Sequence, residues 1–337
     1  MSPKNFRIKK QILLCRVNIG KILETFRAIQ SGATENEDYG NMLILNEYAG
    51  MKKIKGVPGR LQHGWEKLRI ERSDYRNNNL RTFVWAQDAE EYAKSQGWKN
   101  FTSIGAPWLY LLDILDSQGW RKYELNSLRF IDELWVYGLH SVTADDPWAA
   151  GLIPFLEAAN TSPARKKLVL LAYFDYIKLD ELEKERFHNL DFVTLGGRRR
   201  NVSANSHLFR LYHLLIQTKL VVADYPTTLV FYALSVGCDI RWHHNESLIH
   251  AKKLAKVVNN FELVQAMEKV VLHHNEYLAF AHSNLGFESK KTPTDLRRIF
   301  GWEEVSSKRM IHAPRVLIEY FMVIGRFLKF QISKPQN

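Results

Sequence analysis

The sequence is poor in cysteine. Cys15 and Cys238 are its only two cysteines in 337 residues, and they match neither a disulfide framework nor a zinc-binding cluster. No run of 18 uninterrupted apolar residues occurs, so we expect no transmembrane helix. Near the N-terminus, Arg16 ends an apolar stretch after four residues, which is too short for a secretory signal. These absences predict a protein of a reducing compartment, and we expect it in the cytoplasm.

Four motifs of nucleotide-dependent and hydrolytic enzymes are missing as well. The sequence contains no GxGxxG and no GxxxxGK[ST], which disfavours a dinucleotide-binding Rossmann site and a P-loop. It has no Asp-x-Asp, the carboxylate pair of metal-dependent nucleotide-sugar sites. It also lacks the GxSxG nucleophile elbow. We therefore expect neither a metal ion nor a bound cofactor.

What the sequence does have is an excess of positive charge. It carries 47 lysines and arginines against 36 aspartates and glutamates, a formal net charge of +11. Such an excess favours anionic partners: nucleic acid, phosphorylated small molecules or an anionic membrane surface. Nucleic acid is the least favoured, because the basic residues are spread along the chain and match no binding motif. The apolar stretch 316–330 fits either a packed final helix or one that docks on a membrane surface.

Apolar runs of strand length alternate with helical patterns along the chain. Strands are expected at 42–48, 82–87, 132–138, 166–174, 191–197, 220–224 and 238–242. Their alternation with helices predicts βαβ units and parallel sheets. The predicted fold class is therefore α/β, with two Rossmann-like domains, an N-terminal one at 1–128 and a C-terminal one at 129–337. Within the second domain, 246–337 has the pattern of a helical extension.

The segment Asp224–Thr228, with the sequence DYPTT, follows one of these strands. Ligands of open parallel sheets bind outside the carboxyl ends of the strands. Pro226 suits the first turn of a helix, and Thr227 and Thr228 then offer hydroxyls and free N–H groups at its positive end. Such an end is a generic phosphate site. Capping of the helix by a threonine side chain is the alternative.

Other polar residues follow strands in the same way. His63, between Gln62 and Gly64, fits a general base facing a cleft or a histidine bonded to a nearby carbonyl. His140 and Ser141 open the first loop of the second domain. A basic loop contains Gly196, Gly197 and Arg198, which could admit a nucleotide or simply be solvated. Two histidine pairs, at 243–244 and 273–274, lack the spacing of a metal site, and the acidic pair at 145–146 fits a solvated loop.

Taken together, these motifs resemble the GT-B glycosyltransferases of bacterial surface polysaccharide and lipooligosaccharide synthesis. The resemblance rests on the Gln-His-Gly-Trp loop, the His-Ser loop and the Asp-Tyr-Pro-Thr-Thr turn, which occur in that order between residues 43 and 242. The most similar group uses CMP- or CDP-activated donors and includes sialyltransferase-like, Kdo-transferase-like and polyol-phosphate-transferase-like enzymes. Ser141 stands where the sialyltransferase-like His-Pro motif has proline, and the acidic base motif of that group is not visible in the N-terminal half.

The resemblance implies a role for each motif. His63 would be the general base, with Gln62 and Gly64 on the acceptor side, and His140 would assist departure of the leaving group. The nucleotide-sugar donor, a CMP-sugar in the favoured case, would be held through its phosphate by residues of the second domain: Ser141, Gly196, Gly197, Arg198, Asp224, Thr227 and Thr228. The acceptor would be a glycan or a lipid-linked glycan. A peripheral position on the inner membrane is then expected.

Three other functions stay open on the sequence alone. A polyol-phosphate transferase of the same fold would use the same residues with a different donor. A basic protein that binds nucleic acid would use the net charge, and an inactive GT-B scaffold would bind a partner protein.

Overall fold

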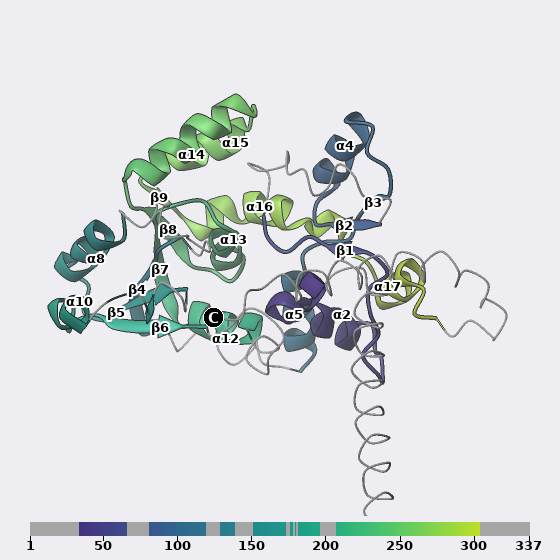
Figure 1. Cartoon of the computed structure of the whole chain (residues 1–337), viewed down its shortest axis with the longest axis horizontal. Helices are drawn as coiled ribbons and strands as arrows, with labels where there is room; N and C mark the ends of the chain where they lie inside the picture. The colour runs from purple at the N-terminus through teal and green to yellow at the C-terminus, as the bar shows by residue number, and fades with distance from the viewer. Residues whose placement is uncertain are drawn as a thin grey trace, which may run out of the picture.

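The computed structural model of the chain describes residues 34–65, 81–118, 129–138, 151–172, 176–177, 179, 181–195 and 207–303. These residues form an α/β structure with two separate β-sheets (Figure 1), as the alternating pattern predicts. The apolar stretch 316–330 lies outside the described residues.

The first sheet has three short parallel strands in the order β1-β2-β3. Its elements, in chain order, are η1 (Thr34–Gly40), α2 (Asn41–Tyr48), β1 (Arg60–Leu61), β2 (Thr82–Val84), α4 (Gln87–Ser95), β3 (Phe101–Ser103) and α5 (Pro107–Ser117). Helix α5 starts with proline at its first turn, where the missing N–H costs no helical hydrogen bond.

The strand expected at 42–48 is wrong, because this segment is helix α2. Four consecutive apolar residues at 42–45 fit a buried strand or a buried helix equally well. The context decides: Ile44 and Leu45 are buried in the core, and Tyr48 packs edge-on against Tyr110 of α5 with ring centroids 4.7 Å apart. Asn46 then holds the end of the helix, donating to Met42 O and Lys55 O and accepting from the Lys55 N–H.

The second sheet has six strands in the order β6-β5-β4-β7-β8-β9. Its elements are β4 (Ile131–Val136), α8 (Leu152–Thr161), β5 (Lys167–Leu171), α10 (Glu181–Arg186), β6 (Asp191–Thr194), α12 (His207–Ile216), β7 (Thr218–Ala223), α13 (Thr228–Ser235), β8 (Asp239–Trp242), α14 (Glu246–Val257), α15 (Phe261–Glu268), β9 (Val271–Leu272) and α16 (His274–Leu285), then η2 (Phe287–Ser289) and α17 (Pro293–Phe300). All pairings are parallel except β8 with β9.

Counted within this sheet, the strand order is 3-2-1-4-5-6, the order of a doubly wound Rossmann-type sheet. The order reverses between β4 and β7, which are direct neighbours. The helical extension expected at 246–337 is interrupted by β9, which returns to the sheet and pairs antiparallel with β8.

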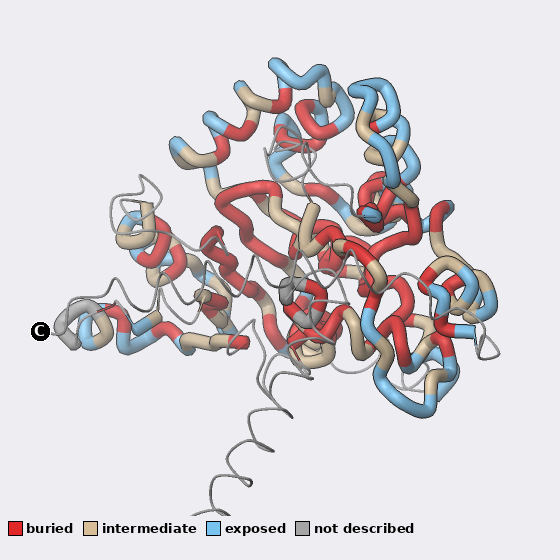
Figure 2. Tube along the Cα trace, turned by 45° about the vertical axis from the view of Figure 1, so that its right-hand side comes forward, coloured by how far each residue is buried: buried red, intermediate tan, exposed pale blue. Residues whose placement is uncertain are grey.

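Helices α5 and α13 bring the two sheets together. The Trp108 indole of α5 stacks on the Tyr232 ring of α13, with centroids 4.4 Å apart and planes 15° from parallel. Its Nε1–H donates to Ser235 Oγ at 2.8 Å. Buried residues of both sheets form one continuous apolar cluster around these helices, the central red region of Figure 2. A second cluster fills the space between α8 and the other face of the six-stranded sheet.

The chain then crosses back to the three-stranded sheet. The Ala106 N–H donates to Leu285 O at the end of α16, and Gly286 packs so closely that a Cβ there would lie 1.9 Å from Trp85 O. Beyond it, Phe300 of α17 meets Phe83 of β2 edge-on at 4.9 Å. Residues 287–302, part of the extension expected for the second domain, therefore continue onto the first sheet.

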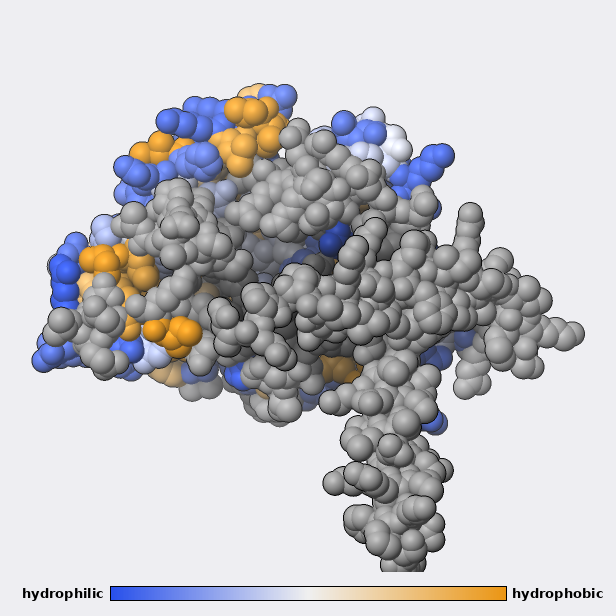
Figure 3. All heavy atoms as spheres, viewed as in Figure 1, coloured by the Kyte–Doolittle hydropathy of each residue, from blue (hydrophilic) through white to orange (hydrophobic). Residues whose placement is uncertain are grey.

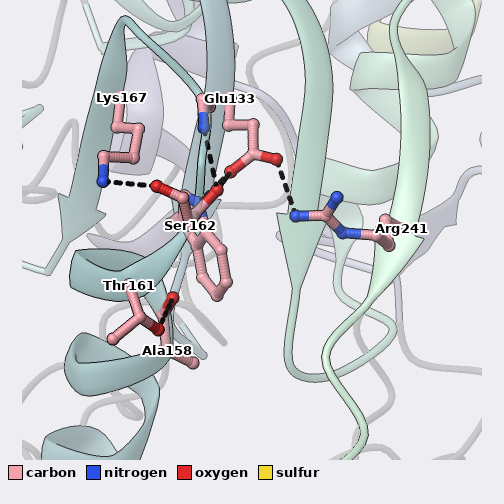
Figure 4. Close-up of polar contacts among 8 residues, drawn as sticks. Glu133, Ala158, Thr161, Ser162, Lys167 and Arg241 are labelled. Atoms are coloured by element: carbon pink, nitrogen blue, oxygen red, sulfur yellow. Dashed lines mark hydrogen bonds and ion pairs between the residues drawn. The ribbon is translucent and has the colours of Figure 1, made fainter.

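A buried carboxylate ties β4 to its neighbours (Figure 4). Glu133 Oε2 accepts from Ser162 Oγ at 2.6 Å and from the Trp135 indole at 2.7 Å. Its Oε1 pairs with Arg241 of β8 at 2.7 Å. Lys167 closes the same corner by donating to Ser162 O. The charge is thus compensated on both oxygens, as a buried charge requires.

Replacing Glu133 with alanine is expected to lower the free energy of unfolding by roughly 2–3 kcal/mol. The substitution leaves the Arg241 guanidinium, the Ser162 hydroxyl and the Trp135 indole without their acceptor. Because Arg241 is partly exposed, the cost falls below that of breaking a fully buried ion pair. Urea denaturation measures it. Asp132 is the residue next to Glu133, and Asp132→Ala removes only a solvent-screened ion pair with Lys219, so it should cost clearly less. Equal losses in the two variants would contradict this account.

Within the described residues, no helix combines the length and the apolar character needed to cross a bilayer. Cys238 is buried and not in a disulfide.

Candidate functional site

The reversal of strand order makes the carboxyl ends of β4 and β7 the candidate position for a ligand site. Strand β4 ends at Val136 and leads into Tyr137 and Gly138. Strand β7 ends at Ala223 and leads into Asp224. The DYPTT turn therefore lies at the topological switch point of the sheet, the position where this architecture binds ligands.

Asp224 is the unusual residue of this turn. It is 1% exposed, and neither carboxylate oxygen accepts a hydrogen bond in the part of the chain that the structure describes. Burial raises the pKa of the carboxyl group to about 7, although the backbone N–H groups of Asp224 and Gly138 lie near enough to lower it in part. An unsatisfied buried carboxyl costs stability, and such strain is retained at functional sites more often than elsewhere.

Helix α13 begins at Thr228, four residues after Asp224. Thr227 is the N-cap residue, in an extended conformation, but its side chain makes no capping hydrogen bond. The prediction of capping by a threonine hydroxyl is therefore wrong. Pro226 precedes the N-cap instead of occupying the first turn. The Val230 N–H bonds back to Thr227 O, whereas the N–H groups of the first two helical residues have no partner within the helix.

The Thr228 hydroxyl is used differently from either expectation. Its Oγ1 accepts a 2.8 Å hydrogen bond from the Trp65 N–H. Gly64 approaches so closely that a Cβ there would lie 3.1 Å from the same oxygen. The loop after β1 thus docks on the N-terminus of α13, and the structure brings together two segments 163 residues apart in sequence.

Trp65 anchors this loop through three contacts. Besides its N–H bond to Thr228, its indole Nε1 donates to Asn284 Oδ1 of α16 at 2.9 Å. Its ring packs on Phe231 of α13 with centroids 4.8 Å apart. Trp65 is the last residue of the Gln-His-Gly-Trp motif, and no role was predicted for it. A tryptophan directly after a glycine turn was the available signal, whereas nothing in the sequence marks Asn284.

Gln62 fixes the start of the loop. Its Oε1 accepts from the Trp85 N–H and its Nε2 donates to Gly64 O, both at 2.8 Å. Its backbone O accepts from the Trp85 indole at 3.0 Å. Gln62 therefore holds the loop to the end of β2, and His63 lies half-buried between this anchor and Gly64.

A second histidine, His243, lies at the carboxyl edge of the six-stranded sheet. It follows β8, and its N–H donates to Ala223 O at the end of β7. Its ring packs against Phe155, with centroids 5.3 Å apart and planes 89° from parallel. Burial lowers the pKa of His243, with further lowering by His244 and Arg241. His243 therefore favours its neutral form more than an exposed histidine does.

The other predicted site residues are His140, Ser141, Gly196, Gly197 and Arg198, and they lie outside the described residues. Among the residues that are described, no group of three or more histidine, cysteine or carboxylate side chains is arranged to hold a metal ion. The pair at 273–274 has structural contacts instead: His273 Nδ1 lies 3.2 Å from Asp239 Oδ2, and the His274 N–H donates to Asp239 Oδ1.

No protein-family model matches the sequence, and no curated protein sequence matches it either.

Proposed function

We propose that the protein is an inverting, metal-independent glycosyltransferase of the GT-B type that moves a sugar from a nucleotide-activated donor to a surface glycan acceptor. The observation that carries the proposal is the docking of the Gln62–Trp65 loop on the N-terminus of α13. A base candidate on the first sheet and an anion-binding helix end on the second thus face the same place. A CMP-sugar is the favoured donor.

The donor phosphate is assigned to the N-terminus of α13. The free N–H groups of the first helical turn and the positive end of the helix dipole stabilise the negative charge that builds on the leaving phosphate. His140 would add a proton donor there. Because N–H groups and a dipole supply this stabilisation, the reaction needs no divalent metal.

His63 is assigned as the general base. It takes the proton of the acceptor hydroxyl while that oxygen forms a bond to the anomeric carbon, on the face opposite the nucleotide. The bond from the anomeric carbon to the phosphate oxygen breaks with its electron pair, which leaves on the nucleotide. The hydrogen bonds of Gln62 and Trp65 fix the loop that carries His63, so the base is positioned before substrate binds. A glycan or a lipid-linked glycan is the acceptor.

Nucleotides are expected to raise the melting temperature of the full chain. CMP or CDP at saturating concentration should raise it by several degrees, more than UDP or GDP, since ligand binding stabilises the folded state by mass action. EDTA should leave the shift unchanged. A nucleic-acid-binding protein would instead show no nucleotide shift and salt-sensitive binding to DNA, which would contradict the proposal.

Thr227→Ala is the matched variant for this panel. The Thr227 hydroxyl makes no capping bond, so its removal should change the melting temperature of the free protein little. The nucleotide shift should shrink if the hydroxyl contacts the donor phosphate. Thr228→Ala is less suitable because it also removes the acceptor of the Trp65 N–H.

A further inference from the structure

Helices α14 and α15, with the turn 258–260 between them, form a helical hairpin that exposes apolar side chains. Its inner face is buried through residues such as Leu248, Ala255 and Met267. Nine large apolar side chains are exposed among the described residues, and five of them lie on this hairpin or directly after it: Ile249 (53%), Val257 (77%), Val258 (43%), Phe261 (66%) and Val270 (68%). Such a concentration marks an interaction surface.

The hairpin rises from the sheet edge that holds the candidate site. Strand β8 leads through residues 243–245 into α14, and α15 leads into the antiparallel strand β9. Both ends of the hairpin are therefore attached at the carboxyl edge of the sheet, and the hairpin projects beyond it (Figure 1). Any surface that binds the hairpin would lie close to the switch point.

Lysines separate the apolar residues on this surface. The outer face of α14 carries two apolar residues and two lysines: Ile249, Lys253, Lys256 and Val257. Their spacings of four, three and one residues place them along one side of the helix. In Figure 3 the hairpin accordingly shows orange apolar patches bordered by blue. The exposed acidic residues are at the first turn of α14 and on α15: Glu246, Glu262 and Glu268.

We infer that the α14–α15 hairpin docks on an anionic phospholipid surface. Protein interface cores are depleted in lysine, whereas membrane-surface helices combine lysines with single apolar side chains. A lysine can bury its hydrocarbon stem and keep its ammonium group among the lipid phosphates. The projecting turn places Val257, Val258 and Phe261 where they can enter the headgroup region. The net charge of +11 favours the same partner.

The test is flotation of the full chain with vesicles of phosphatidylethanolamine and phosphatidylglycerol, compared with vesicles of phosphatidylcholine. The wild-type protein should float with the anionic vesicles only. Val257→Ser/Phe261→Ser should weaken this binding on the order of tenfold, and Lys253→Gln/Lys256→Gln should have a similar effect. Ile54→Ser is the matched control, because Ile54 is 62% exposed on another part of the protein, and its binding should stay unchanged.

Equal vesicle binding by the hairpin variants and the wild type would overturn the inference and point to another segment, such as 316–330. Absence of wild-type binding to anionic vesicles would overturn it as well. Sedimentation velocity adds a third outcome: a wild-type dimer that the serine substitutions dissociate, without vesicle binding, would identify a second copy of the chain as the partner. No substrate is needed, so failure here is independent of the proposed transferase activity.

Discussion

Replacing His63 with alanine is expected to lower the transfer rate by about 10²–10⁴-fold, the usual contribution of a general base. The nucleotide-induced rise in melting temperature should persist. His63 is on the loop of the first sheet, whereas the proposed phosphate site is the N-terminus of α13 on the second. The measurement is release of nucleotide from the donor sugar in the presence of acceptor, with the nucleotide chosen by the thermal-shift panel.

Two comparisons make this result specific to proton transfer. Added imidazole should restore part of the rate in the alanine variant, which a purely structural defect would not allow. The His188→Ala variant, which changes an exposed histidine in the turn between α10 and β6, should transfer at the wild-type rate. A His63→Ala variant with unchanged transfer would remove His63 as the base and leave a carboxylate or His243 for that role.

The strands of the second sheet could be predicted because burial on both faces makes them continuous aliphatic runs. LVLL in β5 and LVVA in β7 are of this kind. The same rule fails for α2, whose run at 42–45 is equally apolar. Only its packing against α5, a contact distant in sequence, selects a helix. The two-residue strand β1 gives too little pattern to be recognised at all.

The sequence was enough to predict which loops form the candidate site, but not how those loops contact one another. A parallel sheet directs the loops after its strands to one edge, so Asp224 and Thr227 could be chosen from sequence. The contact of Trp65 with Thr228 could not, because it depends on how two sheets pack through α5 and α13. The preference of threonine for N-cap positions predicts where Thr227 lies but not its hydrogen bonding, because its side chain makes no capping hydrogen bond.

Replacing Asp224 with asparagine is expected to stabilise the protein at neutral and alkaline pH while weakening nucleotide binding. The folded carboxyl has a pKa of about 7 because burial disfavours its charged form, and the nearby backbone N–H groups offset this only in part. In the unfolded chain its pKa is about 3.9. Asparagine has nearly the same shape as the protonated acid and carries no charge to bury.

The sign of the effect follows from proton binding. Below about pH 4 the carboxyl is protonated in both the folded and the unfolded state, so the wild type and the variant have the same stability. Between about pH 4 and 7 the unfolded chain releases its proton and the folded protein keeps it, so wild-type stability falls as pH rises. Above pH 7 the difference is constant. Three pH units at about 1.4 kcal/mol each give an upper limit of about 4 kcal/mol.

Urea denaturation of both proteins at pH 4 and pH 8 tests the prediction, with equal stability at the lower pH and a more stable variant at the higher one. Asp132→Asn is the control of opposite sign, because a hydrogen bond from Lys219 lowers the pKa of Asp132, and its loss should not stabilise the protein at any pH. If Asp224→Asn is no more stable than the wild type at pH 8, the charge of the wild-type carboxylate is compensated by a partner in solution. A gain with unchanged nucleotide binding would place the donor elsewhere. If Asp224→Asn both stabilises the protein and weakens nucleotide binding, the wild-type carboxyl is retained for its ligand at a cost in stability. A residue retained for packing alone would show neither the gain in stability nor the loss of binding.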